Sequence, residues 1–347
     1  MSAAPLFSQR LAAQLASFAL VALTAASATA QTPSAQKSPG QARDVRTWLM
    51  RIHEAAGHQN FQGTFVVSAG GNVASARMAH FCEGPNQYER IESLDGKARN
   101  VYRFNDSVHT LWPTSHVAVI EQRDLLNSFP ALLQAGGDGI DDWYDVQPQP
   151  DERVAGHEAN VFVVHAKDAY RYGYRLWSDK ASGLLLRADV LGERGDVLET
   201  SAFSDIAIGV RPQPESVVQP MKRLDGFRVF RPTLRPTRLE QEGWSMRQSA
   251  PGFRQVRCVN REMETTAESD AATAPQRVLQ AIYADGMTYV SVFIEPYRPK
   301  RHTQPIQASM GATQTLAARQ GDWWITVVGD APLATLRLFA TGLERTK

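Results

Sequence analysis

The fold is decided by residues 170–209, which read YRYGYRLWSDKASGLLLRADVLGERGDVLETSAFSDIAIG. From Tyr172 to Leu176, aromatic or apolar residues alternate with other residues, which is the period of a β-strand with two unlike faces. Turn-forming residues at 178–183 and 192–196 divide the segment into three runs. Connections this short join antiparallel neighbours, because a parallel crossover needs a dozen or more residues. The segment therefore predicts an antiparallel meander of three strands.

The composition is that of an ordinary globular protein. Of 347 residues, 43% are hydrophobic and 21% are charged, which is enough for two domains. The formal net charge is only +1, so the chain has no overall field that would attract nucleic acid. We therefore expect no nucleic-acid partner.

Residues 1–30 predict a signal peptide that is cleaved after Ala30. Arg10 supplies the positive end, and an apolar run of about fourteen residues from Leu11 to Thr24 follows it. Small residues precede the cleavage point. The apolar run is too short to remain as an anchor in a bilayer, so an exported, soluble protein is expected.

Residues 31–42 are small and polar and predict a disordered leader. A helix is predicted next, with Asp44 capping its start and Gly57 its end. Its apolar face is formed by Val45, Trp48, Leu49, Ile52 and Ala56. A helix with one apolar stripe needs a sheet or a second helix to bury that stripe against.

From Phe61 onward the apolar period is two, and turn residues recur about every ten residues. Strands are expected at 61–69, 73–82, 87–94, 98–104, 108–112, 117–122, 143–146, 153–155 and 159–165. Residues 124–135 are expected to be helical or irregular. Together with the meander this makes roughly ten strands, and a sheet of that size curls. We predict a large antiparallel unclosed β-barrel with few helices over residues 43–210, whose concave face is either filled by side chains or left as a ligand cavity.

A smaller α+β domain is predicted over residues 237–346, after a proline-rich linker at 211–236 of extended character. Its strands are expected at 253–260, 276–284, 287–295 and 323–328, the second and third joined in a hairpin at Asp285-Gly286. A closing helix has Pro332 in its first turn and an apolar stripe formed by Leu333, Leu336, Ala340 and Leu343.

The sequence lacks the motifs of common enzymes: G-x-S-x-G, H-E-x-x-H and the Walker-A loop are absent. No nucleophile, base and orienting residue stand out as a set. We therefore expect a binding protein without cofactor or metal rather than an enzyme.

Two features of the sequence favour binding. Apolar residues on the helix and the strands could line a groove in the curled sheet, although most such residues form ordinary core. The candidate lipid groove consists of Trp48, Ile52, Phe65, Val67, Met78, Phe104, Trp112, Tyr172 and Tyr174. A basic loop supplies Arg298, Lys300 and Arg301 as candidate contacts to an acidic partner or to lipid phosphates, with a merely solvated loop as the alternative.

The two cysteines, Cys82 and Cys258, lie far apart in the sequence. In an oxidising compartment two such thiols tend to form a disulfide if the fold brings them together. We predict this disulfide, which would staple the two domains; two separately buried thiols are the alternative.

Four stretches together resemble the RseB/MucB proteins, the periplasmic negative regulators of the envelope-stress sigma factor (sigma-E/AlgU type) in Gram-negative bacteria. They are WLMRIHEAAGHQNFQGTFVV (48–67), QYERIESLDGKARNVYRFND (87–106), NSFPALL (127–133) and YRLWSDKASGLLLRADVLGERGDVLETSAFSDI (174–206). The second domain adds the segments 252–253, 283–286 and 327–330. The resemblance covers nearly the whole mature chain and implies a periplasmic location.

The resemblance implies a large domain similar to the lipoprotein carriers LolA and LolB. It also implies that the smaller domain binds the periplasmic part of a membrane-spanning anti-sigma factor (RseA/MucA-like) and shields it from the first protease of the cascade. Lipopolysaccharide or lipid fragments would occupy the large domain and release the complex, which requires that they bind the released state more tightly. A homo-oligomer is left open.

Two other functions compete with this hypothesis. A periplasmic lipid or lipoprotein carrier would have the same large domain but no need of residues 237–346. An exported hydrolase is disfavoured by the lack of a catalytic set.

Overall fold

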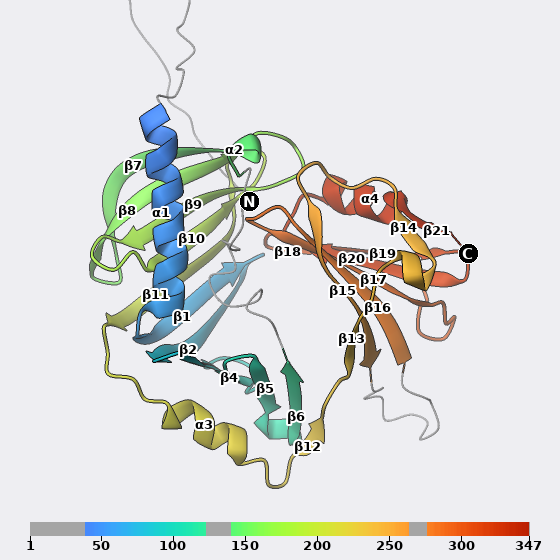
Figure 1. Cartoon of the computed structure of the whole chain (residues 1–347), viewed down its shortest axis with the longest axis horizontal. Coiled ribbons are helices and arrows are strands. Elements are labelled where there is room, and N and C mark those ends of the chain that lie inside the picture. The colour runs from blue at the N-terminus through green and yellow to red at the C-terminus, as the bar shows by residue number, and fades with distance from the viewer. Residues whose placement is uncertain (1–38, 123–139, 264–275, 347) are drawn as a thin grey trace, which may run out of the picture. The chain divides into compact units, whose positions relative to one another are not determined.

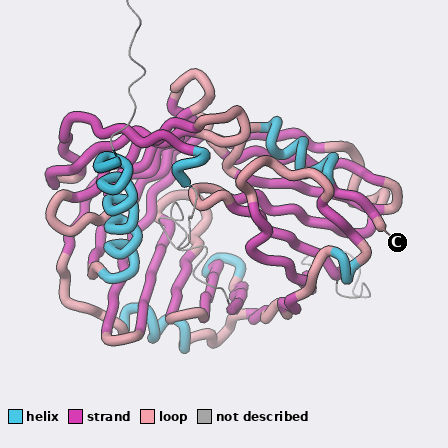
Figure 2. The backbone as a smooth tube through the Cα atoms, turned by 45° about the horizontal axis from the view of Figure 1, so that its top comes forward, coloured by secondary structure: helices cyan, strands magenta, loops and turns pink. Residues whose placement is uncertain are grey.

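The structure of the chain is a computed structural model that describes residues 39–122, 140–263 and 276–346. Residues Pro39–Lys347 form one compact unit. Sheets of twelve, seven and two strands dominate the described part (Figures 1 and 2). Its helices are α1 (Pro39–His58), α2 (Ile140–Trp143), α3 (Glu215–Lys222) and α4 (Leu333–Gly342). None of these described helices combines the length and the apolarity needed to cross a bilayer.

The larger sheet is antiparallel over almost its whole width. Its strands are β1 (Phe61–Ala69), β2 (Asn72–Glu83), β3 (Asn86–Ser93), β4 (Asn100–Phe104), β5 (Ser107–Trp112), β6 (Val117–Gln122), β7 (Tyr144–Val154), β8 (His157–Ala166), β9 (Gly173–Asp179), β10 (Leu185–Leu191), β11 (Val197–Ile208) and β12 (Arg228–Phe230). They are ordered β12-β6-β5-β4-β3-β2-β1-β11-β10-β9-β8-β7, and of these strands only β12 runs parallel to its neighbour. The described edges, β7 and β12, do not pair with each other, so the sheet is unclosed.

The predicted meander is confirmed as β9, β10 and β11. Its antiparallel register places Leu176 opposite Ala188, and Arg187 opposite Ala202. The predicted fold class is also confirmed, since a large unclosed antiparallel sheet is followed by a smaller α+β domain. The turn residues and the short connections were sufficient to predict this topology.

The two short strands expected at 143–146 and 153–155 are wrong as separate elements. They form one strand, β7, whose register shifts between Gln149 and Glu152. Pro148 and Pro150 are tolerated within this strand because β7 is an edge strand and its register is irregular there.

Helix α1 begins at Pro39, earlier than the predicted start after Asp44, so it takes up the end of the expected leader. A proline is accepted at the first helical position because its missing N–H would have no helical partner there. The signal peptide at 1–30 and the helical or irregular segment at 124–135 lie outside the described residues.

Helices α1 and α3 cover opposite faces of the large sheet (Figure 1). Ala55 of α1 shares a core cluster with Met78 of β2. Val217 of α3 shares another cluster with Ala79, the next residue of β2. Consecutive side chains of a strand point to opposite faces, so the two helices pack on opposite sides. We call the face that carries Met78 and is covered by α1 the inner face.

The expectation of an extended linker at 211–236 is wrong. This segment contains α3 and β12, and its last residues form β13 (Leu234–Pro236) of the second sheet. Val217 and Met221 of α3 are buried against the large sheet. Apolar residues at this spacing form a helix once a sheet surface is available to bury them, even among prolines.

The second sheet forms the core of the smaller domain. Its further strands are β15 (Arg254–Met263), β16 (Gln276–Ala284), β17 (Tyr289–Pro296), β18 (Ile306–Met310), β19 (Thr313–Gln320) and β20 (Trp323–Gly329), in the order β13-β15-β16-β17-β20-β19-β18. Helix α4 packs on it through Leu336 and Phe339, both fully buried. A two-stranded sheet pairs β14 (Trp244–Met246) with β21 (Leu343–Arg345), which begins directly after α4. The hairpin β18–β19 was not predicted: Ile306, Ala308 and Met310 alternate with polar residues, but the run is only five residues long and is exposed on both faces.

Candidate functional site

Part of the predicted lipid groove lies on the inner face, but in separate clusters. Trp48, Ile52 and Tyr174 are buried together between α1 and the meander. Met78 and the half-buried Phe65 belong to a second cluster. These five residues form core under α1 rather than one continuous cavity.

The other predicted groove residues lie in different parts of the structure. Phe104 lies in the cluster under α3, on the opposite face, so it cannot line a groove with the residues above. Tyr172 is buried, and its hydroxyl accepts a hydrogen bond from the side-chain amide of Gln314 at 3.4 Å, in the second sheet. Val67 and Trp112 are half-buried.

A band of half-buried apolar side chains extends across the inner face. Ile91 of β3 packs against the Met78 cluster and pairs with Val101 of β4. Val101 pairs with Thr110, which pairs with Val119. Directly paired residues share a face of the sheet. We call these side chains the apolar band: Phe65, Val67, Ile91, Val101, Trp112 and Val119.

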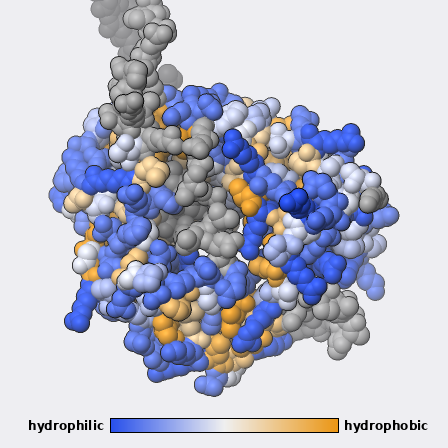
Figure 3. All heavy atoms as spheres, viewed as in Figure 1, coloured by the Kyte–Doolittle hydropathy of each residue, from blue (hydrophilic) through white to orange (hydrophobic). Residues whose placement is uncertain are grey.

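A second apolar surface was not predicted from the sequence. Apolar side chains gather in the view of Figure 3 over the region where Figure 1 shows α3 and β12. Half-buried Val218, Leu224, Phe227 and Val229 belong to this region. The segment is rich in proline, so the sequence was not interpreted as a helix with an apolar stripe.

A pocket with a volume of about 520 Å³ is lined by the β1–β2 turn, the start of β11 and the end of β18. Glu199, Ser309 and Gly311 contribute to a lining that is mostly polar or glycine. Such a lining suits polar groups and not an acyl chain.

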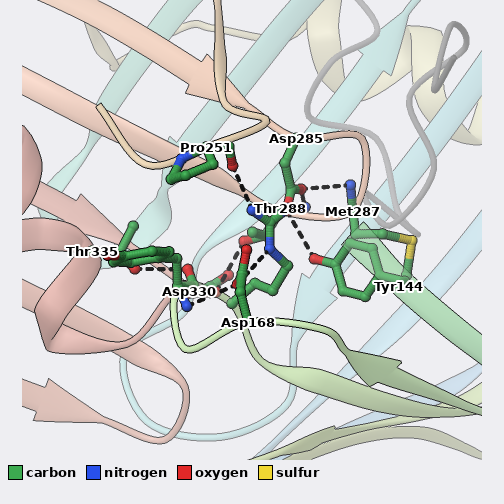
Figure 4. Close-up of polar contacts among 10 residues, drawn as sticks. Tyr144, Asp168, Pro251, Asp285, Met287, Thr288, Asp330 and Thr335 are labelled. Carbon is green, nitrogen blue, oxygen red and sulfur yellow. Dashed lines mark hydrogen bonds and ion pairs between the residues drawn. The ribbon is translucent and has the colours of Figure 1, made fainter. Parts of the chain in front are cut away.

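A buried ion pair joins the large sheet to the second sheet. Arg171, between β8 and β9, is 2% exposed and donates to Asp285 Oδ2 at 2.8 Å. Asp285 lies in the turn between β16 and β17 and also accepts a hydrogen bond from the Tyr144 hydroxyl at 2.9 Å (Figure 4). Arg171 donates further to the Asp168 carboxylate and to the Pro251 carbonyl. The guanidinium is thus almost fully paired in a dry environment.

The turn that carries Asp285 is itself locked to both sheets. Asp285 Oδ1 accepts the backbone N–H groups of Met287 and Thr288, each at 2.9 Å. The Met287 side chain is buried in the Trp48 cluster of the large sheet. Burial, with the charges of Tyr174 and Asp285, raises the pKa of Tyr144 well above its ordinary value, so this phenol stays a neutral donor. The sequence predicts only a hairpin at Asp285-Gly286. Nothing in it indicates that Asp285 pairs with an arginine.

A second ion pair links the sheets at the other side of the large domain. Arg261 of β15 donates to Glu121 of β6, whose side chain is 5% exposed. The two ion pairs make the contact between the sheets polar and geometrically specific.

The predicted basic loop is held in shape by His302. Its Nδ1 accepts the backbone N–H of Arg298 at 3.0 Å, and its ring stacks on Trp324 with centroids 4.7 Å apart. Arg301 lies 3.5 Å from Glu295 and is partly neutralised. Arg298 is half-buried and Lys300 is exposed. Lys300 is therefore the member of the loop best placed to meet an acidic group.

The predicted disulfide is wrong, because Cys82 and Cys258 are both free thiols. Cys258 is buried in the core of the second sheet, where burial raises the pKa of its thiol to about 11. Cys82 is half-buried on β2 of the large sheet, and its Sγ lies 3.3 Å from His80 Nε2. Their spacing in the sequence does not indicate that the fold places them in different sheets.

The side chain of His80 is the centre of a buried polar cluster on the inner face. His80 Nδ1 lies 3.3 Å from Glu89 Oε1, and Arg103 donates to Glu89 Oε2 at 3.3 Å. Burial alone would lower the pKa of His80, but the hydrogen bonds and charges of Cys82 and Glu89 prevail and raise it to about 9.

This pKa predicts a stability change at high pH. Because the folded-state pKa of His80 lies above the ordinary 6.5, the stabilisation is complete below pH 6.5 and is lost as pH rises through about 9. Relative to His80→Gln, the wild-type chain should lose about 3 kcal/mol of unfolding free energy between pH 6 and pH 10. Urea unfolding of both proteins across this range measures the difference, and a constant difference would contradict the prediction. The facing groups are Cys82, Glu89 and Arg103.

The fold and the site define a two-domain β-rich protein, in which an unclosed antiparallel sheet is joined through buried ion pairs to a smaller α+β domain. The chain belongs to the MucB/RseB family. The MucB/RseB N-terminal domain matches residues 44–221, and the MucB/RseB C-terminal domain matches residues 238–344. The family resemblance read from the sequence is thereby confirmed.

Known relatives match along nearly their whole length. The sigma factor AlgU regulatory protein MucB of Pseudomonas aeruginosa is 28% identical over 319 residues, which cover 88% of this chain and 92% of the relative. A crystal structure of MucB in complex with MucA(peri) superposes with a TM-score of 0.63 at 26% identity, covering 87% of this chain and 99% of that one. A Pseudomonas aeruginosa MucA/MucB complex gives a TM-score of 0.66 at 26% identity, covering 88% and 99%.

Proposed function

We propose that this chain is a non-enzymatic periplasmic regulator that binds the periplasmic part of a membrane-spanning anti-sigma factor and protects it from regulated proteolysis. The observation that carries the proposal is the similarity, over both domains, to MucB in its complexes with MucA. The likeness covers 88% of this chain.

We propose further that a lipid, lipopolysaccharide or a fragment of it, binds the inner face and promotes release of the partner. The apolar band supports this part, since a row of half-buried apolar side chains suits acyl chains better than the polar 520 Å³ pocket does. The junction supports the coupling. In this proposal a ligand shifts the two sheets relative to each other and breaks the buried Arg171–Asp285 pair, which would give two distinct states.

The test is a calorimetric titration of the mature chain with the periplasmic segment of the anti-sigma factor from the same organism, with and without lipopolysaccharide. Tight binding that the lipid weakens is the expected result. Binding that ignores the lipid removes the sensing part and keeps the regulator. If the segment does not bind and the chain instead captures lipid or lipoprotein, the protein is a carrier and the proposal fails.

The basic loop adds a sharper prediction to the same titration. Lys300→Glu should weaken binding of the segment by about two- to fivefold, because an exposed ion pair contributes up to about 1 kcal/mol. The loss should shrink at high salt. Arg194→Glu is the matched control, since Arg194 is equally an exposed cation but lies in the β10–β11 turn of the large sheet. Equal losses for both variants would show a general charge effect and no contact at the loop.

A further inference from the structure

The register of β2 and β3 assembles a set of groups that the sequence did not reveal. Cys82 and His80 are two residues apart on β2, so both side chains project from the inner face. Glu89 of β3 is the cross-strand partner of His80. The result is a chain of contacts from Cys82 Sγ to His80 Nε2 at 3.3 Å and from His80 Nδ1 to Glu89 Oε1 at 3.3 Å.

This chain has the arrangement of a nucleophile, a base and an orienting carboxylate. The imidazole can take the thiol proton at Nε2, while Glu89 fixes the ring and stabilises its positive charge through Nδ1. The raised pKa of His80 agrees with an imidazolium in this position. A thiolate beside an imidazolium is the form in which a cysteine reacts.

One neutral group also contacts the thiol, and a second holds the backbone of Cys82. The carbonyl of Gly57, at the end of α1, accepts from Cys82 Sγ at 3.0 Å and favours the protonated thiol. A charge-assisted hydrogen bond is roughly twice as strong as a neutral one, so the contact with a protonated His80 is the stronger of these two contacts of the sulfur. The backbone N–H of Cys82 is held by Asn60 Oδ1 at 2.7 Å, which fixes the position of the sulfur.

Arg103 lies at the end of the cluster that is remote from Cys82. Arg103 is 5% exposed and donates through Nη1 to Glu89, but its Nη2 is buried without a hydrogen-bond partner among the described residues. The cluster therefore holds more hydrogen-bond donors than acceptors.

We propose that Cys82 is a modification site that hydroperoxides oxidise to a sulfenic acid, with His80 as proton donor and Glu89 as the positioning residue. The thiolate sulfur attacks the terminal oxygen of the hydroperoxide, so an S–O bond forms and the O–O bond breaks. The leaving oxygen takes the Nε2 proton of His80 and departs as water or an alcohol. The sulfur is oxidised by two electrons, and the hydroperoxide is reduced by the same two.

The surroundings favour a small oxidant over disulfide exchange. Cys82 is half-buried against the end of α1, which restricts bulky reagents. The other thiol, Cys258, is buried in the core of the second sheet and cannot serve as a resolving thiol. This inference is independent of the proposed regulatory function.

The test uses the mature full-length chain in its reduced form, with Cys258 as an internal control. Native protein at pH 7 is treated with iodoacetamide, and the two cysteine peptides are followed by mass spectrometry. Cys82 should react about tenfold faster than the thiols of the same chain in denaturant, because an ordinary thiol is only a few per cent ionised at pH 7. Cys258 should remain unmodified until the chain unfolds. A Cys82 rate no higher than that of the unfolded chain overturns the proposal.

A second experiment treats the native chain with hydrogen peroxide and then with dimedone, which traps sulfenic acids. A dimedone adduct on Cys82 and none on Cys258 is the expected result; the absence of an adduct on Cys82 overturns the assignment of hydroperoxides. His80→Gln should slow both reactions about tenfold while Cys258 stays protected, which shows that the variant is folded. If Cys258 becomes reactive, Glu89→Gln replaces that variant. Unchanged Cys82 rates in a folded variant overturn the role of the chain of contacts.

Discussion

Replacing Arg171 with methionine should lower the free energy of unfolding by about 3–5 kcal/mol. Methionine retains much of the side-chain length but leaves Asp285 buried with a negative charge and no cation. The carboxylate keeps its hydrogen bond from Tyr144, but a neutral phenol does not replace a guanidinium. The cost is high because the environment is dry, and an exposed ion pair would contribute far less.

Urea unfolding of the mature chain measures this loss, and Arg175→Met is the matched control. Arg175 lies on the neighbouring β9 but is exposed, so its replacement should change stability by less than about 0.5 kcal/mol. Asp285→Asn completes a double-mutant cycle, in which a coupling near zero between positions 171 and 285 would contradict the ion pair. Equal effects of Arg171→Met and Arg175→Met would contradict it as well.

Replacing Trp48 with alanine should also cost about 3–5 kcal/mol. Its ring packs on Phe162 with centroids 3.9 Å apart, and its indole N–H donates to Ser178 Oγ at 2.9 Å. The substitution leaves a cavity between α1 and the meander and removes the partner of the buried Ser178 hydroxyl. Because Trp48 anchors α1, the helix should also detach more readily from the inner face.

Chemical unfolding measures the stability of this variant, and hydrogen exchange of the α1 amides measures the detachment. Met50→Ala is the control on the same helix, since Met50 is 49% exposed and should contribute less than about 0.5 kcal/mol. Trp48→Phe should recover part of the loss, because it restores packing without the hydrogen bond. Similar unfolding curves for Trp48→Ala and Met50→Ala would show that α1 is not anchored by Trp48.

Local patterns in the sequence were enough to predict most strands of the large sheet, with β7 and β12 as the exceptions. Period-2 alternation located β1 and β6 with the bounds that the structure shows, because each has flanking turn residues. Family motifs in both domains identified the family. The same patterns failed for α3, whose apolar stripe lies among prolines, and for β18, which has no buried face.

The candidate site was predicted far less well than the fold. Phe104 was placed in the groove because alternation shows which residues share a face of one strand. It does not show which helix covers that face, and here α3 does. The disulfide was predicted from compartment and cysteine count, but Cys82 lies half-buried on the large sheet and Cys258 lies in the core of the second sheet. The strands next to Arg171 and Asp285 were predicted, but 114 positions separate the two residues in the chain, so their pairing was not.

The sequence by itself determined the elements whose cause is local: the meander from 170 to 209, the apolar stripe of α1 and the turn at Asp285-Gly286. Side-chain period and turn chemistry act over a few residues, so they can be read directly. Only the tertiary structure decided the pairing of Arg171 with Asp285, and of Cys82 and His80 with Glu89. The first depends on the packing of two sheets, and the second on the register between two strands. Register and packing are set by burial summed over whole surfaces, so no short stretch of sequence contains them.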